Sequence, residues 1–321
     1  MNAAMKKKSS KGQTPVHGRQ TVSEAFGAIL RHNYKHLLAW EGAARSGDDI
    51  EGVHQLRVAF RRMRSALRVF RSAVPRPVTV RWADAMRELA NQSGPARDLD
   101  VFIDEGLNAI ADQLPLPGRE KLLALAWQRR EGAYAAVRVL LDSDRYTSFK
   151  EHFSVWLDDQ GWLTGELNDQ QRDRLESNVV PFARQRLDKQ ERRVLAVGSH
   201  VDQASAQAMH QLRIECKKLR YAAEFFTPLF ERMEDFINHL KGLQDLLGVM
   251  HDVTIMHHLL EELLAGEQDP EVLQYAGGLV GWRSHQYYEI KNSFDERWEQ
   301  FVSTKHPWWR KAALDQTGPD Q

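Results

Sequence analysis

One segment of this chain occurs twice. Residues 53–70 read VHQLRVAFRRMRSALRVF and residues 209–226 read MHQLRIECKKLRYAAEFF, and the two align without a gap at an offset of 156 residues. Self-similarity of this kind is the sequence signature of a repeated architecture. We therefore predict an internal duplication, with a first helical half at residues 21–160 and a second helical half at residues 170–310.

The spacing of apolar residues favours helices throughout. Apolar residues recur mainly every three or four positions, which places them on one face of an α-helix. The sequence has no Asn-Gly or Asp-Gly hairpin signal and no sustained alternation of apolar and polar residues. Breakers such as Gly94 and Gly248 occur at intervals suited to helices. We predict an all-α protein of about ten helices, with a disordered basic tail at 1–20 and a polar tail at 311–321.

Composition limits the function classes. The 321 residues include 44 Lys and Arg against 44 Asp and Glu, so the formal net charge is zero. A polybasic carrier is excluded, and anion binding has to come from the arrangement of the charges. The single cysteine, Cys216, cannot form a disulfide within the chain and indicates a reducing compartment. No apolar run approaches the roughly 18 residues of a membrane span, and no secretory signal is recognisable. We expect a soluble cytoplasmic protein.

Each copy of the repeat forms an amphipathic helix when its residues are placed about 100° apart. One face of each helix carries apolar residues, and the opposite face carries basic residues in the same register. The basic residues on these faces are His54, Arg57, Arg61, Arg64 and Arg68 in the first copy and His210, Arg213, Lys217 and Arg220 in the second. Like charges at spacings of three and four residues repel one another. Two such stripes indicate a site where a bound anion neutralises them, and Arg and Lys suit phosphate oxygens.

Simpler interpretations of these stripes stay open at this point. A basic stripe is also found on solvent-exposed helix faces and on faces that are salt-bridged within the protein. The histidine that leads each stripe, His54 or His210, can donate to phosphate and titrates near neutral pH, but such a histidine also serves as a cap or a packing residue. The repetition in matched register favours the anion site.

Other constellations carry weaker signals. His32 and His36 have a spacing that suits a metal ion, but further ligands and an HExxH motif are lacking, so we expect no metal and no cofactor. Cys216 lies on the apolar face and is interpreted as a small buried hydrophobe. Asp98 and Asp252 occupy matching places and are interpreted as helix caps, with orientation of a basic side chain as the alternative. No Walker A, GxGxxG or GxSxG motif occurs.

The duplicated segment resembles the CHAD family, the conserved histidine α-helical domain. The similarity covers residues 21–310 and includes GPARDLD at 94–100, LDSDRY at 141–146 and KGLQDLLGVMHD at 241–252. It implies two pseudo-symmetric four-helix bundles that face each other, with basic residues lining a central groove or cavity. It also implies binding of inorganic polyphosphate without catalysis. The family's basic positions fall on the two stripes, and those that rest on weaker matches are Arg62, Lys218, Arg97 and Lys241.

These observations lead to a specific hypothesis. The two basic helices are expected to face each other and to bind successive phosphates of a polyphosphate chain. A nucleic-acid binder is the alternative, but the stripes lack the interleaved aromatics that stack on bases. An enzyme acting on a phosphorylated substrate would need carboxylates for Mg²⁺, which the stripes also lack. The triphosphate tunnel signature ExExK is absent, so a stand-alone domain is expected. Contact with granule-associated proteins through the basic tail or the Trp308-Trp309 pair is compatible with this role.

Overall fold

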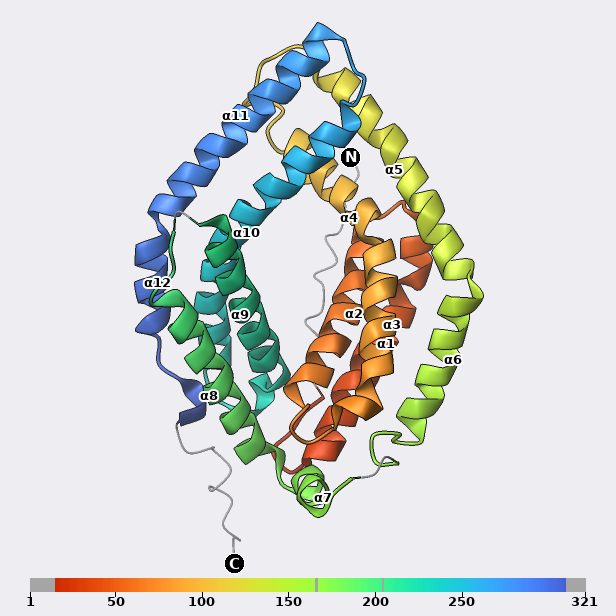
Figure 1. Ribbon diagram of the computed structural model, residues 1–321, viewed down its shortest axis with the longest axis vertical. Helices are drawn as coiled ribbons and strands as arrows, with labels where there is room; N and C mark the ends of the chain where they lie inside the picture. The colour runs from red at the N-terminus through yellow and green to blue at the C-terminus, as the bar shows by residue number, and fades with distance from the viewer. Residues whose placement is uncertain (1–14, 165–166, 204, 310–321) are drawn as a thin grey trace, which may run out of the picture.

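The computed structural model describes residues 15–164, 167–203 and 205–309 as two helical halves that lie side by side (Figure 1). The first half contains α1 (Val22–Ser46), α2 (Glu51–Val69), α3 (Arg76–Gln92), α4 (Gly94–Val101), a π-helical turn (Phe102–Asn108), α5 (Arg119–Asp142) and α6 (Asp144–Asp158). The second half contains α7 (Asp169–Glu176), α8 (Val179–Gly198), α9 (Ala206–Phe225), α10 (Met233–Leu263), α11 (Pro270–Asn292) and α12 (Phe294–Val302), with short 3₁₀ turns at Thr227–Leu229 and Pro307–Trp309.

All regular structure in these ranges is helical, apart from one isolated bridge between Thr21 and Asn178. The predicted all-α class is therefore confirmed, and both copies of the repeat are helices, α2 and α9. A common evolutionary origin of the two halves stays a prediction. Within the described ranges, no helix combines the length and the apolarity that a bilayer crossing requires.

The described residues begin inside the segment that the sequence assigned to the N-terminal tail. Val16 is buried in the core. The backbone N–H of Val22 donates to Ser177 O at 2.9 Å, and that of Val179 donates to Gln20 O at 3.0 Å. Residues 15–20 therefore fasten the start of α1 to the start of α8. Residues 1–14 of the predicted basic tail, and the predicted polar tail, lie outside the described residues.

The two halves share one core at the end of the molecule where α2 and α9 finish. The ring of Phe70, at the end of α2, lies 5.9 Å from that of Phe226, at the end of α9. Phe70 also stacks on Phe182 of α8, with a centroid distance of 5.0 Å. Phe70 and Phe226 are corresponding residues of the repeat, so the two copies meet at equivalent side chains.

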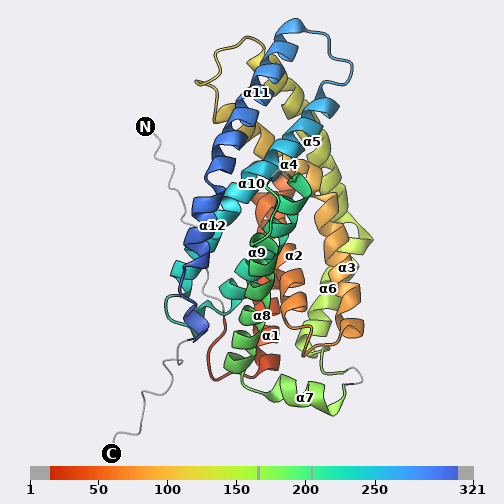
Figure 2. The same ribbon diagram turned by 60° about the vertical axis from the view of Figure 1, so that its left-hand side comes forward.

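A second, separate core joins the halves at the opposite end. It is formed by apolar side chains of α4, the π-helical turn, α5, α10 and α11, among them Leu107, Leu122, Tyr275 and Leu279. Figures 1 and 2 both show α5 and α11 converging there. The halves are therefore joined at both ends, and between these ends Arg61 of α2 lies over the ring of Tyr221 of α9, 5.7 Å from its centroid.

The predicted break at Gly248 is wrong. Helix α10 runs without interruption over Met233–Leu263, whereas the corresponding place in the first half is a true break, at Ser93 between α3 and α4. A glycine inside a helix costs only about 1 kcal/mol. Buried Leu246 and Leu247 precede Gly248 and hold this part of α10 in the core, so packing outweighs the local preference. The side chains of residues 250–252, including Asp252, lie outside the described part of the chain.

A buried ion pair fixes α4 against α5. Arg130 donates through Nε to Asp100 Oδ1 and through Nη2 to the Gly47 carbonyl, both at 2.8 Å. The Tyr134 hydroxyl donates to Asp100 Oδ2 at 2.8 Å. Burial raises the pKa of the Asp100 carboxyl, against the opposing effect of Tyr134 and Arg130. This network connects the GPARDLD segment with the turn between α1 and α2 and so sets the position of Arg97.

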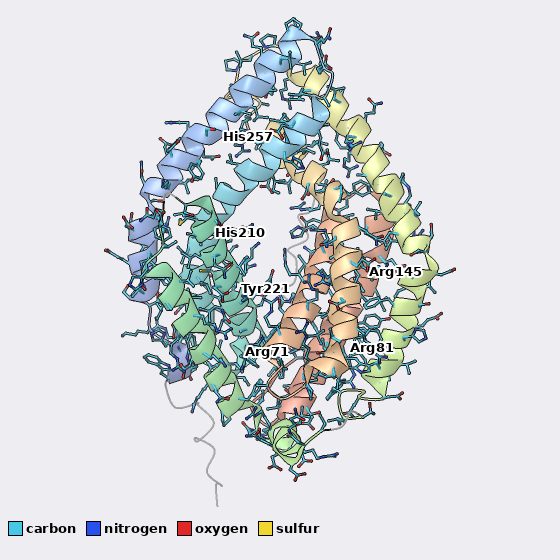
Figure 3. The ribbon with its side chains drawn as sticks, viewed as in Figure 1. Arg71, Arg81, Arg145, His210, Tyr221 and His257 are labelled. Carbon is cyan, nitrogen blue, oxygen red and sulfur yellow. The ribbon has the colours of Figure 1, made fainter. Side chains whose placement is uncertain are left out.

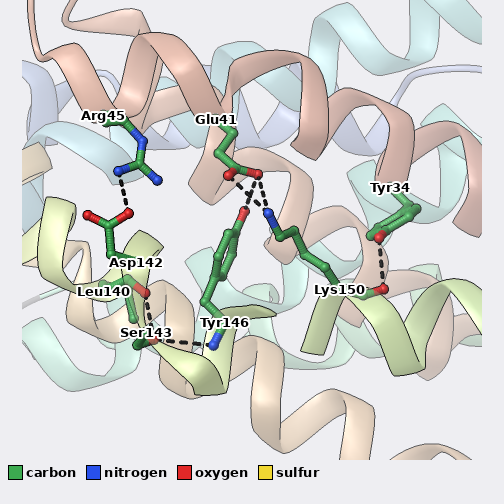
Figure 4. A network of polar contacts seen from close by, with 8 residues as sticks. All are labelled: Tyr34, Glu41, Arg45, Leu140, Asp142, Ser143, Tyr146 and Lys150. Atoms are coloured by element: carbon green, nitrogen blue, oxygen red, sulfur yellow. Dashed lines mark hydrogen bonds and ion pairs between the residues drawn. The ribbon is translucent and has the colours of Figure 1, made fainter. Parts of the chain in front are cut away.

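A second polar network joins α1 to α6 (Figure 4). Glu41 of α1 accepts from Lys150 Nζ at 3.0 Å and from the Tyr146 hydroxyl at 3.2 Å. Ser143 accepts from the Tyr146 backbone N–H at 3.2 Å and so caps α6. Arg45 pairs with Asp142 at 2.5 Å. The LDSDRY segment is therefore structural, because it ends α5, begins α6 and ties both to α1.

The C-terminal aromatic pair holds the end of the described chain on α8. The indole N–H groups of Trp308 and Trp309 donate to Asp188 Oδ1 at 2.7 and 2.6 Å. Trp308 is fully buried and packs edge-on against Phe236 at 4.8 Å, whereas Trp309 is 66% exposed. Trp308 is therefore an anchor, and only Trp309 offers an aromatic surface to solvent.

The buried carboxyl of Glu191 lies beside this anchor and makes the stability of the fold depend on pH. Glu191 Oε1 lies 2.5 Å from His306 Nδ1. Burial, assisted by Asp188, raises the pKa of Glu191 to about 8, from an ordinary value of 4.5. Burial lowers the pKa of His306. Because the folded pKa of Glu191 lies above its unfolded value, its contribution to stability is complete below the unfolded pKa and is lost as the pH rises to about 8.

We expect the Glu191→Gln variant to gain in melting temperature relative to the wild type as the pH rises from about 5 to about 8. The amide does not titrate, whereas the wild-type carboxyl has to ionise in a buried place. The difference in Tm between variant and wild type, followed by circular dichroism at each pH, should change by a few degrees. A difference that is constant across this range would contradict the assignment.

Candidate anion-binding site

The apolar faces of the repeated helices are buried as the pattern predicts. Leu56, Phe60 and Met63 of α2 are fully buried, as are Leu212 and Cys216 of α9. Cys216 is thus a small buried apolar residue, as predicted, and burial raises the pKa of its thiol. The basic faces are thereby turned away from each half's own core.

A cavity of about 450 Å³ lies between α2 and α4 of the first half and α9, α10 and α11 of the second. Its basic lining residues are His54, Arg57, Arg61, Arg97, Arg213, Lys217 and Arg283. The carboxylates in the lining are Asp98 and Glu105, and the rest of the lining is chiefly apolar, including Phe102 and Met256. The cavity therefore collects basic side chains from both copies of the repeat and holds an excess of positive charge.

His54 is held in its neutral form by this environment. Burial lowers the pKa of His54 to about 4, and the positive charges of Arg97, Arg61 and Arg57 act in the same direction, against Glu51. At neutral pH the imidazole is therefore uncharged. The sequence expectation that this histidine titrates near neutral pH does not hold for the free protein.

Arg57 connects the cavity to the break between α3 and α4. Its guanidinium donates to the Ala90 carbonyl and lies beside Gly94, where a Cβ would come within 3.4 Å of Nη1. Burial lowers the pKa of Arg57, and the charge of Asp98 opposes that effect. The interpretation of Asp98 as a helix cap is wrong: α4 begins at Gly94, so Asp98 lies in its second turn, where it acts on a basic side chain.

Four residues of the two stripes lie outside the cavity lining. Arg64 is half-buried near Arg87 and Asp84 of α3, and burial lowers its pKa. Arg220 lies 3.6 Å from Glu224 and stacks on Tyr221. The other two, Arg68 and His210, are exposed, and Figure 3 labels His210 and Tyr221 on α9. The cavity is therefore lined by the N-terminal part of the first stripe and by Arg213 and Lys217 from the middle of the second.

The basic residues that rest on weaker matches to the family also lie partly inside and partly outside the cavity lining. Arg97 lines the cavity. Arg62 pairs with Glu224 across the interface at 3.0 Å, and Lys218 pairs with Glu215 at 2.5 Å. Lys241 is exposed on α10, outside the lining. For Arg62 and Lys218 the salt-bridged interpretation therefore applies: the Arg62 pair joins α2 to α9, and the Lys218 pair lies within α9.

Sequence reasoning missed Arg283 and Glu224. Arg283 of α11 lines the cavity and donates to the Glu105 carbonyl and to Gln286 Oε1. It lies outside the repeat, and no motif marks it. Glu224 was detectable, because it stands in the second copy where the first copy has Arg68, and this single reversal of charge is what pairs α9 with Arg62.

The comparison with known proteins agrees with the motif evidence. The CHAD domain matches residues 28–261. The chain belongs to the CHAD domain family. A crystal structure of the CHAD domain from the plant Ricinus communis aligns with a TM-score of 0.76 and 26% identity, covering 91% of this chain and 95% of that one. PptA from Streptomyces chartreusis aligns with a TM-score of 0.66 at 15% identity, over 87% of this chain and 100% of that chain, and is therefore similar in fold.

Two curated relatives come from Mycobacterium tuberculosis. They are Uncharacterized protein MT2285 (strain CDC 1551 / Oshkosh) and Uncharacterized protein Rv2226 (strain ATCC 25618 / H37Rv), each 28% identical over 266 residues. The match covers 80% of this chain but 48% of each relative. This CHAD domain chain therefore spans about half the length of the curated relatives it matches.

Proposed function

We propose that this CHAD domain binds inorganic polyphosphate in the cavity between α2 and α9 and does not catalyse a reaction on it. The observation that carries the proposal is the convergence of the two repeated helices: Arg57 and Arg61 from one, and Arg213 and Lys217 from the other, line a single cavity. General binding of polyphosphate by the family supports the choice of ligand. Binding of this kind would also retain the protein on polyphosphate deposits such as intracellular granules.

The chemistry of the cavity suits a slender polyanion. Arginine donates in a planar fork to phosphate oxygens, and lysine adds a mobile point charge. The partly apolar walls lower the local dielectric constant, so each charge pair is stronger there than at the surface. A cavity of about 450 Å³ accommodates a single chain of phosphates more readily than a duplex. Because the affinity arises from charge neutralisation, it should fall steeply with salt.

Calorimetry with long-chain polyphosphate tests this proposal. Single-stranded and double-stranded DNA serve as competing polyanions, at about 50 and about 200 mM salt. We expect polyphosphate to bind more tightly than either DNA at both salt concentrations. Equal affinity for all three ligands would contradict a dedicated site and would favour generic polyanion binding. Conversion of polyphosphate to shorter chains, followed by gel electrophoresis, would contradict the non-catalytic part of the proposal.

Polyphosphate binding is expected to be accompanied by proton uptake at His54. The neighbouring cations keep the imidazole neutral in the free protein, and the bound anion opposes them, so the pKa of His54 rises on binding. Affinity should therefore increase as the pH falls below about 6.5. Binding enthalpies measured in two buffers of different ionisation enthalpy report the protons taken up. If the His54→Gln variant takes up as many protons as the wild type, His54 is not the group concerned.

A further inference from the structure

A second group of basic side chains lies at the end of α2 that is remote from the cavity. Its members are Arg68 and Arg71 at the end of α2, Arg174 of α7, and Arg186 and Arg193 of α8. Figure 1 shows α7 and the start of α8 at the end of the molecule opposite the junction of α5 and α11, and Figure 3 labels Arg71 there, between α8 and α2. We call this group the basal arginines.

The surrounding structure holds the basal arginines in place. Phe70 stacks on Phe182 at 5.0 Å, which brings the end of α2 against the start of α8. Arg174 Nη1 donates to the Ser72 carbonyl at 2.7 Å and so fastens α7 to the segment that follows α2. The cluster therefore arises from three helices whose mutual position is set by core packing and a hydrogen bond. This packing keeps the backbones that carry the arginines close together.

Arg186 is the central member of this cluster. It is half-buried, and among the described residues its Nε is a buried donor without a hydrogen-bond partner. Burial lowers its pKa, and the positive charges of Arg71, Arg193 and Arg174 add to that effect. Burying a guanidinium donor without a partner costs free energy, which an arriving anion would recover.

The carboxylate that acts on Arg68 is already engaged elsewhere. Glu215 acts on the pKa of Arg68. Its own oxygens, however, accept from Lys218 Nζ at 2.5 Å and from Gln190 Nε2 at 2.8 Å. One carboxylate shared in this way does not neutralise the basal arginines, so the group keeps an excess of positive charge.

We propose that the basal arginines form a second oxyanion site that takes phosphate groups. Several guanidinium groups converging on a buried donor suit the oxygens of a phosphate. The site lies beyond the cavity along α2: the nearest members of the two groups, Arg61 and Arg68, are about 10 Å apart along the helix axis, and Arg57 and Arg71 about 20 Å. The same site could hold a free phosphate or the distant part of a polyphosphate chain. The second case rests on the function proposed above and makes binding depend on chain length, because a chain that reaches both sites gains from their linkage.

The Arg71→Gln/Arg186→Gln variant tests the site, and an Arg172→Gln/Arg192→Gln variant, changed at exposed positions of α7 and α8, is its control with the same loss of charge. Tripolyphosphate, which is too short to reach both sites, is titrated by calorimetry. We expect two binding sites in the wild type and the control, and one in the basal variant. Without ligand the basal variant should melt no lower than the wild type, because the substitutions remove like-charge repulsion.

Titration with long-chain polyphosphate distinguishes a site for free phosphate from a site for the distant part of a polyphosphate chain. If one chain spans both sites, the basal variant should bind it about tenfold more weakly than the control does. A loss of the second tripolyphosphate site with unchanged long-chain affinity would overturn the spanning chain and retain a site for free phosphate. If the basal variant binds as many tripolyphosphate molecules as the wild type, the basal site itself is overturned. Failure of the cavity function would show differently: a variant of Arg61 and Lys217 would bind long-chain polyphosphate as tightly as the wild type.

Discussion

Replacing Arg61 and Lys217 by glutamate is expected to weaken polyphosphate binding about 100-fold or more. The two residues occupy corresponding positions of the repeat, and both line the cavity. A charge-assisted hydrogen bond contributes about 1.5–3 kcal/mol, and each reversal adds repulsion to that loss. Calorimetry at moderate salt measures the effect. The fold should survive, because the apolar faces of α2 and α9 are untouched.

An equal change of net charge elsewhere is the control for this prediction. Arg192→Glu/Arg297→Glu alters two exposed residues outside the cavity lining. This control should lose only the small, screened part of the affinity that long-range attraction supplies. If both double variants lose affinity to the same extent, the cavity has no special role, and polyphosphate binds through the overall field of the protein.

Replacing Asp100 by alanine is expected to destabilise the protein by about 3–5 kcal/mol. The substitution leaves the buried guanidinium of Arg130 without its carboxylate and removes the acceptor of the Tyr134 hydroxyl. Removing one partner of a buried ion pair is costly because the other charge stays in a poorly solvated place. Urea denaturation followed by circular dichroism gives the free energy of unfolding.

Two further variants separate this effect from simple loss of a negative charge. Asp104→Ala removes an exposed carboxylate in the adjacent π-helical turn and should change the free energy of unfolding by less than about 0.5 kcal/mol. Asp100→Asn keeps part of the hydrogen bonding and should lie between the two. A loss below about 1 kcal/mol for Asp100→Ala would show that the network does not hold α4 in place.

Sequence and structure agree most closely for features that depend on a single helix, such as which of its faces is buried. Helical spacing correctly assigned Leu56 and Leu212 to the core and placed the basic residues on the opposite faces. It failed at Gly248, where burial of the neighbouring leucines keeps α10 continuous. It also assigned a cap to Asp98, although the break at Ser93 places that residue inside α4. At Gly248 packing between helices outweighed a local signal, whereas at Asp98 the helix simply starts four residues earlier, at Gly94.

For this protein, the sequence by itself determined the all-α class, the amphipathic helices and the family, because each follows from residue spacing within one segment or from a motif that recurs. Tertiary structure alone decided which basic residues share a cavity. It brought Arg283 beside the repeat, turned Arg62 to Glu224, and gathered Arg71 with Arg186 at the base. The reason is physical: a helical period sets the angle of a side chain about its own axis, whereas the charge that it meets depends on packing between segments far apart in the chain.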